Sequence, residues 1–111
     1  MINNDDRQIR QLLTWLTTGT KGGKNRAQII KTLKEYPKNS NQLSIRLKVD
    51  YKTIRHHVTI LEKNRLINAV GNHYSTAYFL SQFMEENYPF FEEITMQLNN
   101  SKKRTIKVAQ K

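Results

Sequence analysis

The chain has 111 residues, of which 37% are hydrophobic and 25% charged, and this is the size and balance of a single soluble globular domain. The formal net charge of +10 predicts strong attraction to a polyanion, chiefly nucleic acid or an acidic membrane face. The absence of cysteine excludes disulfides, thiolate metal sites and a cysteine nucleophile.

Two amphipathic helices are predicted at the start of the chain. A pair of acidic residues precedes an apolar stripe from Ile9 to Leu16, which predicts an N-terminal helix within residues 1–20. A second helix begins with Asn25 as its cap and ends before Pro37, because proline disfavours helical geometry in the residue before it.

A helix-turn-helix pattern follows. Ser40 is a good cap for a short helix, and Asp50 caps a longer one. In the longer helix, Ile54, Val58 and Leu61 form a core-facing stripe. The short connection "KVD" matches the geometry in which the second helix enters a DNA major groove.

The opposite face of the longer helix is polar and basic. At about 100° per residue, the residues opposite Ile54 are Lys52, His56, Thr59 and Lys63, with Arg55 at the edge of this face. His57 instead lies beside the apolar stripe, where we expect a hydrogen-bonded residue at the core margin. The two adjacent histidines therefore point in different directions and cannot easily hold one metal ion.

Beyond Asn64 the hydrophobic period changes. "RLINAV" and "HYSTAYFL" flank the turn signal Gly71-Asn72 and predict a β-hairpin at about residues 66–80. Helical spacing then returns, and we expect Pro89 at the first position of the main helix. The tail has little apolar surface to bury, so we expect it to be flexible.

Charge is unevenly distributed along the chain. Residues 1–80 contain 14 Lys and Arg against 5 Asp and Glu, whereas residues 81–100 contain four glutamates and no Lys or Arg. The last eleven residues add five basic residues and no acidic one. The acidic segment carries more apolar residues than a small domain needs for its core, which predicts a dimer interface.

Four segments, "NQLSIRL", "VDYKTIRHHV", "LEKNRLI" and "YFL", resemble the winged helix-turn-helix domain of ArsR-type prokaryotic repressors, particularly the small archaeal winged-helix regulators. The resemblance covers residues 39–81 and extends less specifically back to "GGKNRAQIIKTLKEYP". It implies a three-helix core with a two-stranded wing, commonly a homodimer, that binds duplex DNA and regulates transcription. The cysteine-based metal sites of the sensing members are absent, so metal sensing is not carried over.

The resemblance also implies which residues face DNA, and where this chain differs. The implied contacts are Tyr51, Lys52, Thr53, Arg55 and His56 on the recognition helix and Gly71, Asn72 and His73 at the wing tip. The family usually has glycine where this chain has Lys48, Arg65, His73 and Ser75. At the first two positions, which end helices, a bulky residue is disfavoured by roughly 1 kcal/mol.

We therefore predict a mainly α fold with a small β-hairpin, a winged helix-turn-helix with extra N- and C-terminal helices. The predicted units are an N-terminal helix at residues 1–20, the DNA-binding domain at 24–81, a dimerisation helix at 82–100 and a flexible basic tail at 101–111.

Two sets of site residues follow. The predicted DNA-binding residues are Ser40, Gln42, Tyr51, Lys52, Thr53, Arg55, His56, Thr59, Lys63, Arg65, Asn72 and His73. The predicted dimer interface comprises Leu12, Leu16, Phe83, Tyr88, Phe91, Ile94 and Leu98. No catalytic residue, metal, cofactor or small-molecule ligand is identified, and "KGGK" is too short for a phosphate-binding loop.

The leading hypothesis is a cytoplasmic, nucleoid-associated transcriptional regulator that binds double-stranded DNA as a homodimer. The alternative is a nucleoid-type architectural protein of low sequence specificity, suggested by the high charge and the basic tail. A third hypothesis is a module that docks an acidic protein partner. We expect no membrane association, since the apolar runs are too short to span a bilayer and the N-terminus lacks the apolar core of a secretory signal.

Overall fold

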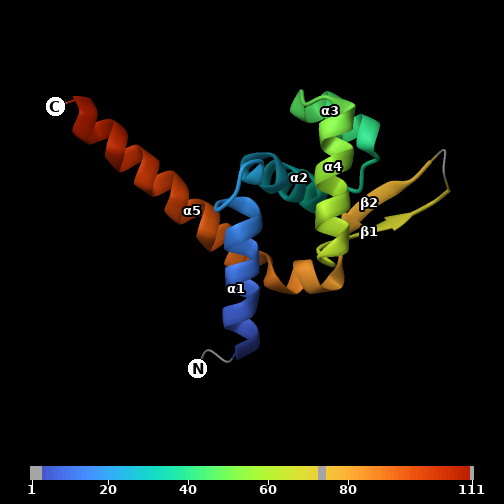
Figure 1. The fold of residues 1–111 in the computed structure, drawn as a ribbon, viewed down its shortest axis with the longest axis horizontal. Coiled ribbons are helices and arrows are strands. Elements are labelled where there is room, and N and C mark those ends of the chain that lie inside the picture. The colour runs from blue at the N-terminus through green and yellow to red at the C-terminus, as the bar shows by residue number, and fades with distance from the viewer. Residues whose placement is uncertain (1–3, 73–74, 111) are drawn as a thin grey trace.

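The protein folds as a winged helix, three helices followed by a β-hairpin, with one additional helix before this unit and one after it (Figure 1). The structure, a computed structural model, describes the backbone of residues 4–72 and 75–110 and the side-chain environments of residues 6–72 and 75–97. The elements in chain order are α1 (Asn4–Thr17), α2 (Gly23–Glu35), α3 (Ser40–Leu47), α4 (Tyr51–Lys63), β1 (Ile67–Val70), β2 (Ala77–Leu80) and α5 (Gln82–Gln110). The predicted mainly α architecture with a β-hairpin is confirmed.

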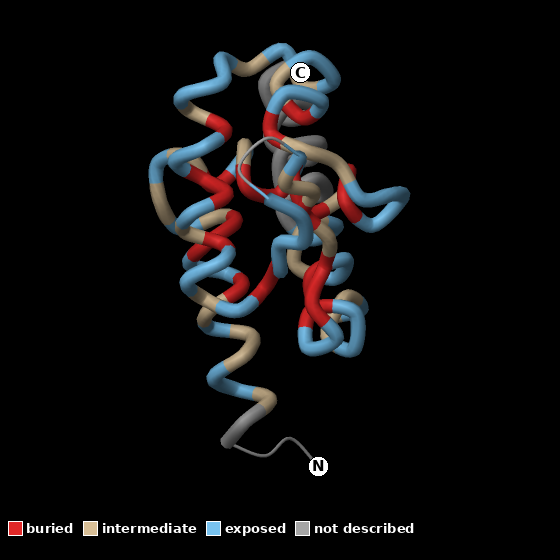
Figure 2. The backbone as a smooth tube through the Cα atoms, turned by 90° about the vertical axis from the view of Figure 1, so that its right-hand side faces the viewer, coloured by how far each residue is buried: buried red, intermediate tan, exposed pale blue. Residues whose placement is uncertain are grey.

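One hydrophobic core joins these elements. The predicted stripe of α4, Ile54, Val58 and Leu61, is fully buried, as are Ile29 and Ile30 of α2. Figure 2 shows the buried stretches on the inward sides of the helices, with exposed stretches facing outward. Burial of one such aliphatic side chain contributes about 1.5–3 kcal/mol.

Two helix starts differ from the prediction. Asn39, and not Ser40, caps α3: its side chain accepts a hydrogen bond from the Gln42 amide, and the Gln42 side chain accepts one from the Asn39 amide. This reciprocal capping box satisfies two amide groups that Ser40 could not satisfy together. Helix α2 begins after Gly22, which has a left-handed backbone, so the expected Asn25 cap is wrong.

The hairpin pairs its strands antiparallel in the predicted region. The register places Ile67 opposite Leu80 and Val70 opposite Ala77. Gly71 has a φ of 114°, and a Cβ there would lie 2.2 Å from the Ser75 carbonyl oxygen, so the turn requires glycine. The predicted wing is confirmed, while His73 at its tip lies outside the described residues.

Helix α5 differs from the prediction at both ends. Pro89 lies inside the helix and not at its first position, because the chain is already helical from Gln82. Proline removes one backbone hydrogen bond and its ring crowds the preceding turn, which bends a helix. Figure 1 shows α5 changing direction early in its course. The helix also continues to Gln110, through the residues predicted as a separate tail.

Helices α1 and α5 extend the core beyond the winged helix. Leu13 and Leu16 of α1 and Met84 and Phe91 of α5 are all fully buried within the single chain. The prediction that Leu16 and Phe91 lie at a dimer interface is therefore wrong, because the two helices pack these residues against their own protomer. Periodicity identified apolar faces correctly but could not distinguish an internal partner from an external one.

Candidate nucleic-acid interface

The turn between α3 and α4 is shaped by an uncommon backbone conformation. Lys48 ends α3 with φ 57° and ψ 43°, the left-handed region that glycine adopts most readily. Its amide donates to the Ser44 carbonyl, and the Ser44 hydroxyl donates to the Val49 carbonyl at 2.6 Å. These bonds hold Lys48 in the strained conformation, and the residue is exposed to solvent.

Helix α4 begins with the cap that the sequence predicts. The Asp50 carboxylate accepts hydrogen bonds from the Thr53 amide at 3.0 Å and the Thr53 hydroxyl at 2.7 Å. These bonds lower the pKa of Asp50. Thr53 is therefore engaged in capping, and its hydroxyl already donates within the protein.

The outward face of α4 is open and positively charged. Most of the predicted groove-facing residues of this helix are exposed: Tyr51, Lys52, Arg55, His56, Thr59 and Lys63. The ion pairs of the described residues are Arg10 with Glu93, Lys34 with Glu85 and Arg46 with Glu35. None of these pairs uses a cation of α4, so its charges are not neutralised by the described carboxylates.

Arg55 connects the recognition helix to the wing. Its Nη1 donates to the Tyr78 hydroxyl at 2.8 Å. Tyr78 is buried, and its backbone pairs with Lys38 through two hydrogen bonds of 2.8 and 3.1 Å. Tyr78 thus connects three parts of the chain by hydrogen bonds: helix α4, strand β2 and the loop before α3.

His57 lies on the inner side of α4, as predicted, in contact with a buried arginine. Its Nδ1 is 3.2 Å from Arg26 Nη1, and Arg26 Nε donates to the Leu16 carbonyl at 2.6 Å. Burial, then the charges of Arg26 and His56, lower the pKa of His57, and burial also lowers the pKa of Arg26. A Cβ on Gly22 would lie 2.6 Å from the His57 ring, so this contact requires glycine.

The remaining predicted DNA-facing residues have mixed environments. Arg65 and Asn72 are exposed, and Arg65 has a left-handed backbone with φ 62°. Ser40 is only 5% exposed, so its side chain does not project from the surface. Gln42 is exposed, but its side-chain oxygen is engaged in the capping box.

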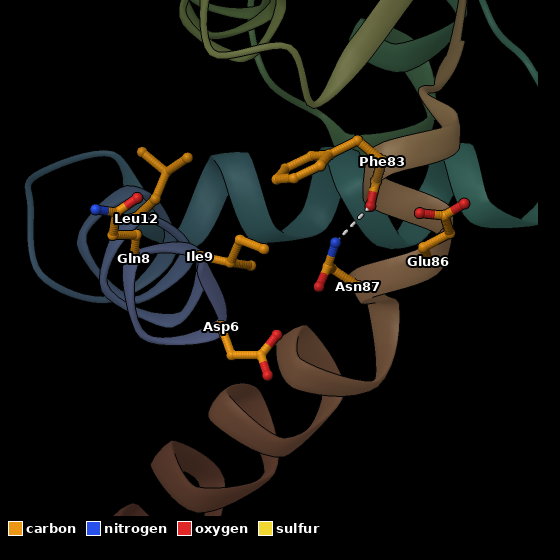
Figure 3. A pocket seen from close by; sticks show the side chains of 7 residues that line it. All are labelled: Asp6, Gln8, Ile9, Leu12, Phe83, Glu86 and Asn87. Carbon is orange, nitrogen blue, oxygen red and sulfur yellow. Dashed lines mark hydrogen bonds between the residues drawn. The ribbon is translucent and has the colours of Figure 1, made fainter. Parts of the chain in front are cut away.

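A separate cavity of about 580 Å³ lies between α1 and the start of α5 (Figure 3). Ile9 and Leu12 line it from α1, and Phe83, Glu86 and Asn87 line it from α5. Two of these residues, Leu12 and Phe83, belong to the predicted dimer interface. Tyr88 and Ile94 are half-buried, and the Leu98 side chain lies outside the described residues.

Sequence reasoning missed two residues that position the site. Tyr78 fixes Arg55 from a strand 23 residues further along the chain, and Arg26 contacts His57 from 31 residues away. The buried alternation of β2 is a signal that Tyr78 points inward, but nothing local identifies its partner. Among the described residues no helix is long and apolar enough to cross a membrane, and no cluster of possible metal ligands is found.

The sequence of residues 23–69 matches the family model described as bacterial regulatory protein, arsR family. This match spans α2, α3, α4 and most of β1. Curated protein sequences give no significant match.

Solved structures with the same fold cover most of the chain. The adhesin competence repressor AdcR from Streptococcus pyogenes aligns with a TM-score of 0.57 and 12% identity over 97% of this chain and 83% of that one. HlyU from Vibrio cholerae aligns with a TM-score of 0.57 and 16% identity over 84% of this chain and 92% of that one. A probable transcriptional regulator from Pseudomonas aeruginosa aligns with a TM-score of 0.58 and 20% identity over 94% of this chain and 89% of that one. At these identities the likeness establishes the fold.

Proposed function

We propose that the chain, whose residues 23–69 match the arsR family model, is a DNA-binding transcriptional regulator that acts as a homodimer with α4 as the recognition helix. In this proposal α4 enters the major groove and the wing contacts the backbone or the minor groove. The observation that carries it is the exposed face of α4, where Lys52, Arg55 and Lys63 are outside the described ion pairs. Such a regulator works in the cytoplasm, on the nucleoid.

Residues beside α4 widen the positive surface. Lys48 and Arg65 lie at the two ends of the α4 region, where each replaces the glycine expected from the family resemblance. Each can approach a phosphate, and each phosphate neutralised adds to salt-dependent affinity. His56 and Thr59 are exposed between these cations and are the candidates for contacts with base edges.

The proposed dimer interface lies at the α1–α5 end. Leu12 and Phe83 line an open cavity there, and Tyr88 and Ile94 retain partial exposure. The chain has a radius of gyration of 15.2 Å, against about 13 Å for a compact domain of this length. A projecting α5 therefore offers surface to a second copy, while Leu16 and Phe91 support that surface from within.

The proposal predicts a palindromic operator. Two recognition helices related by a twofold axis contact successive major grooves about 34 Å apart. The family match favours this specific regulator over an architectural protein of low specificity. Affinity for the operator should then exceed non-specific affinity by roughly 10³ or more.

Selection from random duplex DNA, at a stated salt concentration, tests the proposal. The expected result is an enriched motif with two inverted half-sites, followed by a footprint that protects both. Absence of any enriched motif would overturn sequence-specific regulation, and an affinity ratio near unity would indicate an architectural protein. A single half-site bound by a monomer would contradict the dimer alone.

A further inference from the structure

A small polar cavity lies where the beginnings of α3 and α4 meet strand β2. Its volume is about 140 Å³, and the lining includes Ser40, Asn41, Tyr51, Arg55, Thr76 and Tyr78. Ligand pockets for drug-sized molecules occupy about 300–1,000 Å³. This cavity is too small for such a ligand but has room for one compact oxyanion.

Ser40 gives this cavity an unsatisfied hydrogen-bonding group. The residue is buried, and its hydroxyl oxygen has no hydrogen-bond partner. Buried hydroxyls nearly always have a partner, so the exception at Ser40 points to a ligand. The hydroxyl sits on the first residue of α3, where the first amide groups of the helix have no helical acceptors.

Arg55 supplies a positive charge that is already oriented. One of its five N–H groups donates to the hydroxyl of Tyr78, a buried residue whose backbone is hydrogen-bonded to Lys38. The other donors remain for a ligand. No Asp or Glu lines the cavity, so the hydroxyls and amides around Arg55 present donors without a competing carboxylate.

We propose that this cavity binds a phosphate group, with Arg55 and the Ser40 hydroxyl as its principal donors. The inference rests on the proposed function, because the cavity borders the exposed face of α4 and the wing, where a DNA backbone phosphate would lie. It changes the role expected for Arg55: the guanidinium fixes the position of the backbone and does not read a guanine. The same chemistry would accept free inorganic phosphate.

Operator binding by four variants tests the proposal. Ser40→Ala should lower affinity about tenfold, the value of one hydrogen bond to a charged group. Tyr78→Phe, which releases Arg55, should lower it to a similar degree. Arg55→Ala should also reduce the slope of log affinity against log salt by about 0.9. Tyr36→Phe is the matched control, since Tyr36 is exposed outside the cavity, and its affinity should be unchanged.

Specificity and stability distinguish a phosphate contact by Arg55 from a contact with a base. The phosphate role predicts equal losses for operator and mutated operators in Arg55→Ala, with the base preferences retained. Relaxed preference at one base pair would overturn it and make Arg55 a base-reading residue. Ser40→Ala should melt no lower than the parent protein, because it removes an unsatisfied buried hydroxyl. A lower melting temperature with unchanged DNA affinity would also overturn the proposal.

The source of the phosphate is tested without changing the protein. Titration with inorganic phosphate should shift the Ser40 and Asn41 amide resonances if the free ion binds. An operator with neutral methylphosphonate linkages should bind more weakly if the DNA backbone occupies the cavity. Either result supports the proposal, and absence of both contradicts it. Failure of the parent protein to select any operator would instead contradict the proposed function.

Discussion

The charged residues at the two ends of the molecule differ in whether they form ion pairs. At the α1–α5 end, glutamates of α5 pair with cations of other helices, Glu93 with Arg10 and Glu85 with Lys34. On α4 the exposed cations take no part in the described ion pairs. Exposed ion pairs add only about 0–1 kcal/mol to stability. Their larger effect is on the electrostatic field of the protein, because they leave the net positive charge concentrated on the exposed face of α4.

Reversing the charges on α4 should remove this difference between the two ends and should have the largest effect on DNA affinity. Lys52→Glu combined with Arg55→Glu should lower operator affinity by about 2–6 kcal/mol, from about 1–3 for each lost contact. Fluorescence anisotropy at fixed salt measures the loss. Arg7→Glu, an exposed reversal on α1, is the control and should have little effect. Intact binding by the double variant would favour the hypothesis of an acidic protein partner.

A negative charge introduced at the α1–α5 end should dissociate the proposed dimer into monomers. Phe83 is 36% exposed at the α1–α5 cavity, and Phe83→Asp removes a side chain whose full burial is worth about 1.5–3 kcal/mol. Sedimentation analysis should show a shift from dimer to monomer with the fold retained. Gln82→Asp, exposed at the adjacent position, is the control for added charge. An unchanged dimer would show that protomers associate through another surface.

Acid should weaken the junction between the two ends through His57. Its pKa is lowered below the ordinary value of 6.5, so the unfolded chain binds the proton more readily. This contribution to stability is complete above about pH 6.5 and is lost as the pH falls, by at most about 1.4 kcal/mol per pH unit. Denaturant unfolding between pH 7.5 and 5.5 measures it. His57→Gln should flatten this dependence, and the same slope in both proteins would exclude His57.

The smallest effect is expected at the left-handed residues. Lys48→Gly should raise the free energy of unfolding by about 1 kcal/mol, because glycine adopts this conformation with less strain. DNA affinity should fall together with its salt slope, since one cation is lost. Lys48→Ala keeps the strain and removes the charge, so it should weaken DNA binding without the gain in stability. Equal stability of the two variants would show that the backbone is not strained.

The sequence predicted local features better than long-range partners. The Asp50 cap, the buried stripe of α4 and the hairpin depend on residues close in the chain, and each was predicted correctly. The cap of α3 could also have been found, because Asn39 and Gln42 have the spacing of a capping box.

The errors share a physical origin in tertiary contacts. Leu16 and Phe91 were predicted at a dimer interface but are fully buried within the protomer, because periodicity identifies an apolar face and not the surface against which it packs. The roles of Ser40 and Tyr78 depend on a cavity whose lining residues come from both halves of the helix-turn-helix and from the wing. Composition and periodicity do not predict which of such distant segments contact each other.

The bend at Pro89 has a consequence for the spacing of half-sites. In the proposed dimer, the interface residues Phe83 and Tyr88 lie in the part of α5 before the proline, which follows directly from the wing, and Ile94 lies in the part beyond it. The angle between these parts then sets the distance between the two copies of α4. A straighter α5 would move the recognition helices relative to each other and change the number of base pairs that fits between the operator's two halves.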